Sequence, residues 1–373
     1  MESTPAMSTR AYFELLRWLG PWASPDNAPS RVVRRQIEVP ASVDRPAFPA
    51  WVYAPKGRPP VGSYLVAPGL HYLGPEDPRM DRFLRVLAGA GLLVVAPFLP
   101  DFLALRVRET AAVDLKRAFD VTEALDERPR GTKPGVFSIS FGSLPALRLA
   151  ADEGYRERVG ALVLFGGYAD FREVIRFCLG GADHEGPRDP LNQPVVLMNL
   201  LDDIEAPCET GPVVDAWSRY VRATWGRPEM KAPERWQEVA RALLPQLSDD
   251  AQRAFFELGV GLRSGALELC LDALDCSSER RAFLDPRPHL DGLRCPVHIF
   301  HGADDDVIPW TQMRALDDAL PSHVERRRYL TGLYAHTGKS GIAARLGSAP
   351  ALVKEAGTLI AMLAALVEAS RRR

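Results

Sequence analysis

Short apolar runs alternate with longer helical patterns over the first half of the chain. Six runs of five to eight residues, rich in aliphatic side chains, cover residues 32–39, 48–54, 62–67, 92–98, 135–140 and 161–165. Helical patterns lie between them at residues 79–90, 107–127 and 144–153. This alternation predicts a largely parallel sheet with helices packed on both faces, so the expected fold class is α/β.

The two ends of this pattern differ from its middle. No helical pattern separates the runs at 32–39 and 48–54, so we expect these two strands to pair antiparallel at one edge of the sheet. The next four runs are almost wholly apolar, as expected of strands buried on both faces. They should form the centre of the sheet.

The strand and helix rhythm stops after residue 169 and resumes near residue 291. Runs at 296–301 and 324–330 then alternate with helical patterns at 310–320 and around Leu359. The intervening stretch reads as helical, because Trp236, Val239, Ala240 and Leu243 share one helix face and Ser248 is a suitable N-cap for the next helix. We therefore expect a core of residues 1–169 and 291–373, with residues 170–290 inserted as a helical cap.

Aromatic residues are frequent in the expected cap. They could pack in its core or form the wall of an acyl pocket, and helical spacing favours the core for most of them. The residues concerned are Trp217, Tyr220, Trp225 and Trp236.

Composition narrows the classes of function. The 373 residues are 46% hydrophobic and carry 46 Lys and Arg against 48 Asp and Glu, a formal charge of −2. A nearly neutral chain has no overall field to attract a polyanion, so we expect neither nucleic acid nor a membrane as partner. Five scattered cysteines lack metal-ligand spacing and should be reduced, so we expect no metal and no cofactor.

The chain ends show no targeting or membrane segment. Residues 1–22 mix charged and apolar positions, unlike a signal peptide, and the apolar run 356–367 is too short to span a bilayer. The expected location is the cytoplasm. The oligomeric state is left open.

A strand runs directly into small residues and a helix at Ser138-Ile139-Ser140-Phe141-Gly142. A sharp turn of this kind projects its central side chain out of the sheet, and the positions two before and two after it must be small. The segment resembles the nucleophile elbow of the α/β-hydrolase family, which reads Gly-x-Ser-x-Gly, with Ser138 in place of the first glycine. The resemblance implies that Ser140 is a catalytic nucleophile.

An acidic loop follows the late strand at 296–301. The segment His301-Gly302-Ala303-Asp304-Asp305-Asp306-Val307-Ile308-Pro309 resembles the loop that carries the catalytic acid in this family. Alignment on Gly302 and on the Val-Ile-Pro exit places the acid at Asp305. Its neighbours Asp304 and Asp306 remain alternatives.

Two histidines, His323 and His336, follow the acidic loop. His323 stands at the start of a strand pattern, whereas His336 lies just after it in a glycine-bracketed loop, where an imidazole can lie over the sheet edge. We therefore assign the base to His336. The resulting order Ser, Asp, His is that of the α/β-hydrolase family.

The resemblance also implies an oxyanion hole made of two backbone N–H groups. One belongs to Phe141, which follows the nucleophile, and the other to the loop Ala67-Pro68-Gly69-Leu70-His71. Leu70 is the candidate in that loop, with His71 as the alternative.

The expected activity is hydrolysis of a small or medium-sized, uncharged carboxylic ester through an acyl-enzyme. His336 would take the proton from Ser140, and Asp305 would hold the imidazole. The same triad also serves thioester, amide, peptide or C–C cleavage and acyl transfer. An interpretation from another class is a catalytically silent α/β-hydrolase fold that binds a ligand or a protein.

Overall fold

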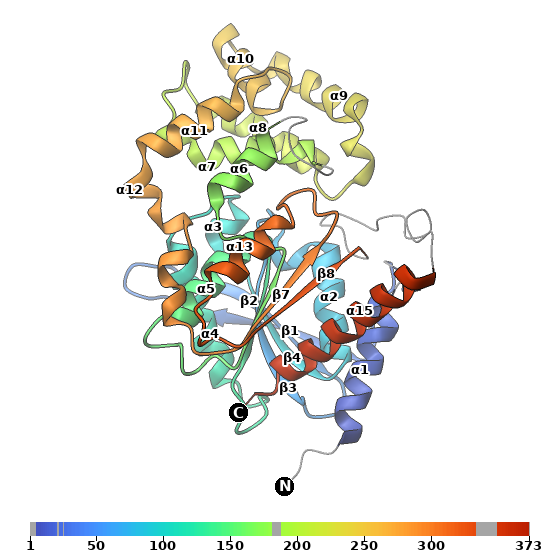
Figure 1. Ribbon diagram of the computed structural model, residues 1–373. Coiled ribbons are helices and arrows are strands. Elements are labelled where there is room, and N and C mark those ends of the chain that lie inside the picture. The colour runs from blue at the N-terminus through green and yellow to red at the C-terminus, as the bar shows by residue number, and fades with distance from the viewer. Residues whose placement is uncertain (1–4, 21, 25, 181–187, 333–348, 373) are drawn as a thin grey trace.

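One twisted sheet organises the molecule (Figure 1). The computed structural model describes residues 5–20, 22–24, 26–180, 188–332 and 349–372. Within them, eight strands lie in the order β1-β2-β4-β3-β5-β6-β7-β8. Their bounds are β1 (Val32–Val39), β2 (Phe48–Pro55), β3 (Gly62–Ala67), β4 (Leu92–Pro97), β5 (Gly135–Ile139), β6 (Leu162–Phe165), β7 (Val297–Gly302) and β8 (Arg326–Thr331).

Strand direction divides the sheet into an edge and a centre. β2 pairs antiparallel with β1 and with β4, and every other neighbouring pair is parallel. Every residue of β3 and β4 is buried. The predicted antiparallel edge and the predicted buried centre are both confirmed.

Helices cover both faces of the sheet, which is why its central strands are continuously apolar. Alternate residues of one strand serve the two faces: Leu65 packs under one layer of helices and Tyr64 under the other. The first layer contains α4 (Thr110–Ala124), α5 (Ser143–Ala151) and α13 (Thr311–Ala319). The second contains α1 (Pro5–Leu19), α2 (Pro78–Gly89) and α15 (Ala349–Ala369).

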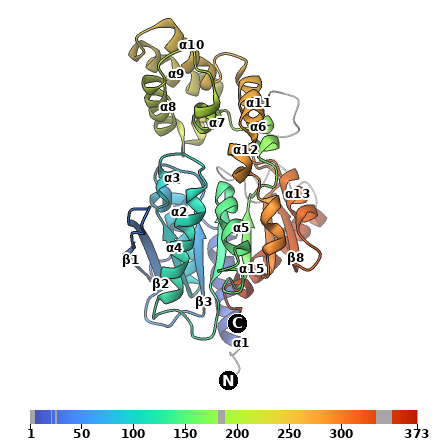
Figure 2. The same cartoon turned by 90° about the vertical axis from the view of Figure 1, so that its left-hand side faces the viewer.

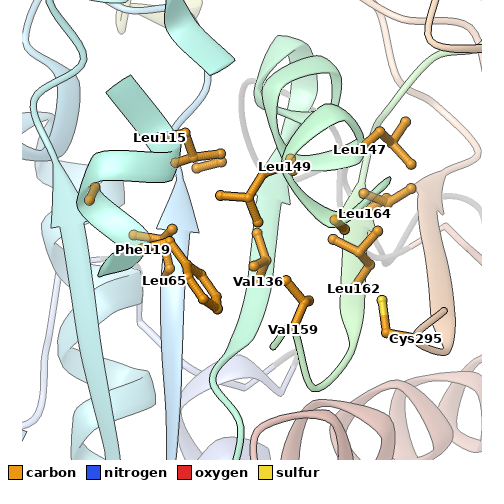
Figure 3. Close-up of a cluster of buried hydrophobic side chains, with 14 of the residues drawn as sticks. Leu65, Leu115, Phe119, Val136, Leu147, Leu149, Val159, Leu162, Leu164 and Cys295 are labelled. Atoms are coloured by element: carbon orange, nitrogen blue, oxygen red, sulfur yellow. The ribbon is translucent and has the colours of Figure 1, made fainter. Parts of the chain in front are cut away.

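Figure 3 shows the first of these two cores. Leu115 and Phe119 of α4 lie over Leu65, while Leu149 of α5 lies over Val136 of β5. All five side chains are completely buried. Because each such side chain stabilises the fold by about 1.5–3 kcal/mol, this layer holds α4 and α5 firmly against the sheet.

The described chain between β6 and β7 contains helical segments joined by turns and loops, and no strand. We call these segments the inserted helices: α6 (Phe171–Leu179), α7 (Gln193–Leu200), α8 (Gly211–Thr224), α9 (Pro233–Leu243), α10 (Asp250–Gly259), α11 (Ala266–Cys276) and α12 (Ser278–Arg281). They gather beyond the carboxyl ends of the parallel strands, as Figures 1 and 2 show. The short helix α3 (Pro100–Leu103) lies on the core side of this boundary.

The inserted helices have a hydrophobic core of their own. Trp217, Tyr220 and Trp236 are buried in it, in line with the role that helical spacing favoured for them. Trp225 differs, because it ends α8 and is only half buried.

Two of the differences from the expected element boundaries have a clear physical cause. The helix predicted at 107–127 covers only Thr110–Ala124, because Leu125 turns into an extended conformation with ψ 126°. The N-cap of α10 is Asp249 rather than Ser248: the Asp249 carboxylate accepts the Gln252 N–H at 2.7 Å. Ser248 instead donates its hydroxyl to the Gln252 side chain. An ionised carboxylate is the stronger acceptor at a helix N-terminus.

All five cysteines are free thiols. Among the described residues, no helix has the length and apolar character needed to cross a bilayer.

Candidate active site

Ser140 stands in a strained turn at the carboxyl end of β5. Its φ is 54°, in the left-handed region that residues with a Cβ atom rarely adopt. A 3₁₀ turn, Ser140–Gly142, leads from it directly into α5. A conformation of this kind costs about 1–3 kcal/mol and persists where the surrounding structure enforces it, most often at functional sites.

Gly142 shows why this turn needs a small residue after the serine. A Cβ atom at Gly142 would lie 2.5 Å from the Pro68 carbonyl oxygen and 2.6 Å from that of Ala67. The start of α5 therefore rests directly on the backbone that leaves β3. Ser138, where the family has glycine, is fully buried within β5, so its small side chain is accommodated.

The loop after β3 lies against the elbow. A Cβ atom at Gly69 would be 3.7 Å from the Ser140 Cβ. Leu70, Phe141 and Ser140 border the same cavity. The sequence-predicted nucleophile and both predicted oxyanion donors are thus neighbours, and the Phe141 N–H lies at the N-terminal end of the helical segment, where negative charge is stabilised.

This cavity, of about 270 Å³, separates the core from the inserted helices. One wall is apolar and consists of Phe171, Val174 and Ile175 of α6 with Val195 of α7. Another wall contains His71, Asp77 and Arg79 from the core, with Trp225, Arg227 and Lys231 from the insertion. Its floor is Ser140, at the carboxyl end of a parallel sheet, which is where open α/β sheets bind ligands.

Cys178 also borders the cavity, so it must be compared with Ser140 as a nucleophile. Burial raises the pKa of its thiol to about 12. The thiol donates a hydrogen bond to the Val307 carbonyl oxygen at 3.3 Å. Because the thiolate is the reactive form of cysteine, Cys178 is inert at neutral pH.

Asp305 lies in the loop that follows β7, at the same edge of the sheet as Ser140. It is 5% exposed, and its Oδ1 accepts the N–H groups of Val307 and Ile308 at 3.0 and 2.9 Å. Its Oδ2 lies 3.5 Å from His301 Nε2. These contacts fix the carboxylate, whereas Asp306 points to a different partner.

That partner is Lys231, whose ammonium group bridges the two parts of the molecule. It contacts Oδ2 of Asp306 and lies 3.2 Å from Oδ2 of Asp189. The Asp189 N–H also donates to the Asp306 carbonyl oxygen at 2.8 Å. Burial raises the pKa of Asp189, although the charge of Lys231 opposes this. The acidic loop is therefore tied to the insertion beside Asp305.

His301 is a site residue that sequence reasoning missed. It is completely buried in β7, and its Nε2 lies 2.9 Å from the Ile308 carbonyl oxygen. The carbonyl must accept, so Nε2 carries the proton. The ring therefore braces the loop that holds Asp305. The spacing of four residues between His301 and Asp305 was the only signal in the sequence.

His71 and Asp77 form a second polar pair at the cavity wall. His71 Nε2 lies 3.4 Å from Asp77 Oδ2, and its Nδ1 accepts the Leu73 N–H at 3.1 Å. Burial lowers the pKa of His71, so the ring is neutral at pH 7. Burial acts to raise the pKa of Asp77, but the hydrogen bonds and charge of Arg79 outweigh burial, so the pKa of this carboxyl is lowered overall. Sequence reasoning had considered His71 only as an alternative oxyanion donor or a packing residue.

His336, the predicted base, lies outside the described residues. The described chain leaves β8 at Thr331 and Gly332, both held by the Glu355 carboxylate. Thr331 pairs with Gly302 at the end of β7, next to the acidic loop. The other late histidine, His323, contacts Arg294 and the Leu293 carbonyl oxygen near the opposite end of these strands. In the described part of the chain no group of three His, Cys, Asp or Glu side chains is placed to hold a metal ion.

Comparison with known proteins gives likenesses in structure alone. No protein-family model and no curated protein sequence matches the chain. An acylaminoacyl peptidase solved with Z-Gly-Gly-Phe-chloromethyl ketone matches 92% of the chain at a TM-score of 0.50 and 13% identity. The acylaminoacyl peptidase of Pyrococcus horikoshii matches 91% of the chain at a TM-score of 0.48 and 13% identity. An esterase of Rhizomucor miehei matches 98% of the chain and 92% of its own length, at a TM-score of 0.45 and 12% identity.

The chain spans less than half of the two peptidases, 43% and 41% of their lengths. The match to the peptidase solved with the chloromethyl ketone, at a TM-score of 0.50, is a likeness of fold. The chain therefore has the α/β-hydrolase fold.

Proposed function

We propose that the protein is a serine hydrolase that cleaves a carboxylic ester through an acyl-enzyme on Ser140. The observation that carries this proposal is the left-handed conformation of Ser140 at the floor of a cavity. A serine used only to fill a turn would be replaced by glycine at no functional cost. A serine kept there at the expense of strain indicates that its hydroxyl is needed.

In this proposal, Asp305 and His336 complete the triad. His336 is the fourth residue after Gly332, and four extended residues reach about 14 Å. The three strand spacings from β8 to β5 also amount to about 14 Å. His336 can therefore reach Ser140 while its ring stays within range of Asp305. The imidazole would accept the Ser140 proton during attack and return it to the leaving group.

The backbone N–H groups of Leu70 and Phe141 are the proposed oxyanion hole. Two observations support this assignment: Gly69 contacts the elbow, and both residues border the cavity with Ser140. One such donor typically contributes a factor of 10²–10³ in kcat. We further propose that residues 170–290 act as a cap, because the inserted helices α6 and α7 form an apolar wall of the cavity that Ser140 borders.

A fluorophosphonate probe tests the nucleophile directly. Wild-type protein should be labelled at Ser140, and Ser140→Ala should not be labelled. Labelling of neither protein would favour a silent fold that binds a ligand. Ser143, buried three residues later in α5, provides a matched control, since Ser143→Ala should keep its label.

A second assay tests the acyl bond. The wild-type enzyme should hydrolyse 4-nitrophenyl esters, and Ser140→Ala should lower kcat by on the order of 10⁴–10⁶. Parallel assays with thioesters and 4-nitroanilides of the same acyl groups decide between bond types. An anilide or thioester turned over faster than the matching ester would overturn the ester assignment while leaving the nucleophile intact.

A further inference from the structure

Hydrogen-bond donors in the cavity outnumber the available acceptors. The two carboxylates in its wall are both engaged: Asp77 binds Arg79 and two backbone N–H groups, and Asp189 binds Lys231 and the Leu191 N–H. Arg79 and Lys231 are thereby neutralised. Arg227 borders the same cavity and has no side-chain partner among the described residues.

Two further hydrogen-bond donors at the cavity also lack a partner among the described residues. The Asn192 Nδ2 atom is buried, borders the cavity and makes no hydrogen bond within the described chain. The His71 Nε2 atom is also buried and makes none, although Asp77 lies 3.4 Å away. Because Nδ1 of His71 accepts the Leu73 N–H, Nε2 carries the proton and is a donor. A buried donor without an acceptor is costly, about 1–3 kcal/mol, and calls for an explanation.

The three donors surround one residue, Trp225. The His71 ring lies 5.7 Å from the Trp225 ring. The Trp225 indole donates to the Leu191 carbonyl oxygen at 3.1 Å, which places Asn192 beside it. Arg227 follows two residues later, after Gly226 turns the chain with φ 78°. The donors therefore gather at one end of the cavity, while the α6 wall formed by Phe171, Val174 and Ile175 is apolar.

We propose that the end of the cavity around Trp225 binds a carboxylate group of the substrate, held by Arg227, Asn192 and His71. One cation without a partner matches one negative charge, and this favours a carboxylate over a phosphate, which carries nearly two at neutral pH. The substrate is then an ester with an apolar part for the α6 wall and a single carboxylate. It differs from the uncharged ester that the sequence led us to expect.

This inference rests on the proposed function, because it assumes that the cavity above Ser140 receives the substrate. The test measures binding without turnover. Monomethyl and dimethyl esters of dicarboxylic acids with five to eight carbons are titrated into Ser140→Ala protein by calorimetry. Each pair differs in one carboxylate. We expect the monomethyl ester of the best chain length to bind about tenfold more tightly, as for a charge-assisted hydrogen bond.

Substitutions identify the side chains responsible for the preference for the monomethyl ester. Arg227→Gln in the Ser140→Ala protein should reduce the preference to twofold or less, and Asn192→Ala should reduce it severalfold. Arg227 is exposed, so its replacement leaves folding intact. Arg235 is exposed on the same insertion but lies outside the cavity lining, and Arg235→Gln should keep the full preference.

The subsite is overturned if no monomethyl ester binds more tightly than its dimethyl partner, or if the preference survives Arg227→Gln. Fluorophosphonate labelling of wild-type protein separates this outcome from failure of the proposed function. Labelled Ser140 without a carboxylate preference rejects the subsite alone. A carboxylate preference without labelling supports the subsite and rejects the hydrolase.

Discussion

Replacing Ser140 by Ala and by Gly measures the strain at the nucleophile. Both variants lack the hydroxyl, and they differ only in a methyl group carried at φ 54°. The same Ala-to-Gly step at Ala146, in the middle of α5, provides the reference, since both positions are at most 4% exposed. Loss of a buried methyl group and the freedom of glycine in the unfolded chain are common to both steps.

The difference between the two steps isolates the left-handed conformation. Ala146→Gly should cost about 2 kcal/mol, the sum of about 1 kcal/mol of helix propensity and 0.8 kcal/mol for the methyl group. A Cβ atom in the left-handed region costs about 1–2 kcal/mol, which glycine recovers at position 140. We therefore expect Ser140→Gly to be nearly as stable as Ser140→Ala.

Thermal unfolding provides the assay. A chain of 373 residues has an unfolding entropy of about 0.8 kcal/mol/K, so a difference of 1.5 kcal/mol corresponds to about 2 °C in Tm. Equal Ala-to-Gly costs at positions 140 and 146 would show that the turn is unstrained. That result would remove the main support for Ser140 as the nucleophile. A smaller Ala-to-Gly cost at position 140 than at position 146 would show that the protein carries a residue with a Cβ atom there at the expense of folding stability.

Four other changes test the site and its frame. Gly142→Ala should destabilise the protein by about 3 kcal/mol in urea unfolding and abolish activity, because its Cβ would meet backbone oxygens at 2.5 and 2.6 Å that cannot move independently. Asp305→Asn should lower kcat by on the order of 10⁴ with its fold intact by circular dichroism, and a loss below tenfold would reassign the acid. Lys231→Met should cost about 3 kcal/mol of unfolding free energy, since two buried carboxylates lose their cation, whereas Lys231→Arg should cost less than half as much. Burial lowers the pKa of His298 to about 4, so between pH 6.5 and pH 4 this side chain is protonated in the unfolded chain but not in the folded one. The free energy of unfolding should therefore fall by about 2 kcal/mol from pH 7 to pH 5. His298→Leu should make the free energy of unfolding less dependent on pH in this range.

Local sequence patterns predicted the strands and turns that position Ser140 and Asp305. The strands that carry Ser140 and Asp305 are short apolar runs whose ends are marked by small or acidic residues, and both residues lie at the carboxyl edge of the sheet. Strand burial and turn chemistry depend on neighbours in sequence, so a single chain displays them. The spacing of Trp217 and Tyr220 indicated their burial for the same reason.

Contacts between distant segments could not be predicted in this way. Lys231 meets Asp189 and Asp306 across 42 and 75 residues of sequence, and no local pattern in the sequence pairs these three charges. The subsite around Trp225 likewise combines donors from the loop after β3, from the residue before α7 and from the segment after α8. Only tertiary packing, within the insertion and between the insertion and the core, brings such groups together.

The core holds Ser140, whereas the insertion carries two of the proposed substrate-binding side chains. Ser140, Phe141 and Gly69 are fixed by the sheet and by the first turn of α5, which rests on backbone atoms and tolerates little change. The donors Asn192 and Arg227 belong to the insertion. Replacing those two side chains should therefore alter which ester is bound while leaving the rate of fluorophosphonate labelling at Ser140 within twofold of wild type. In such a fold the reactive group is set by the core, and specificity is free to change in the insertion.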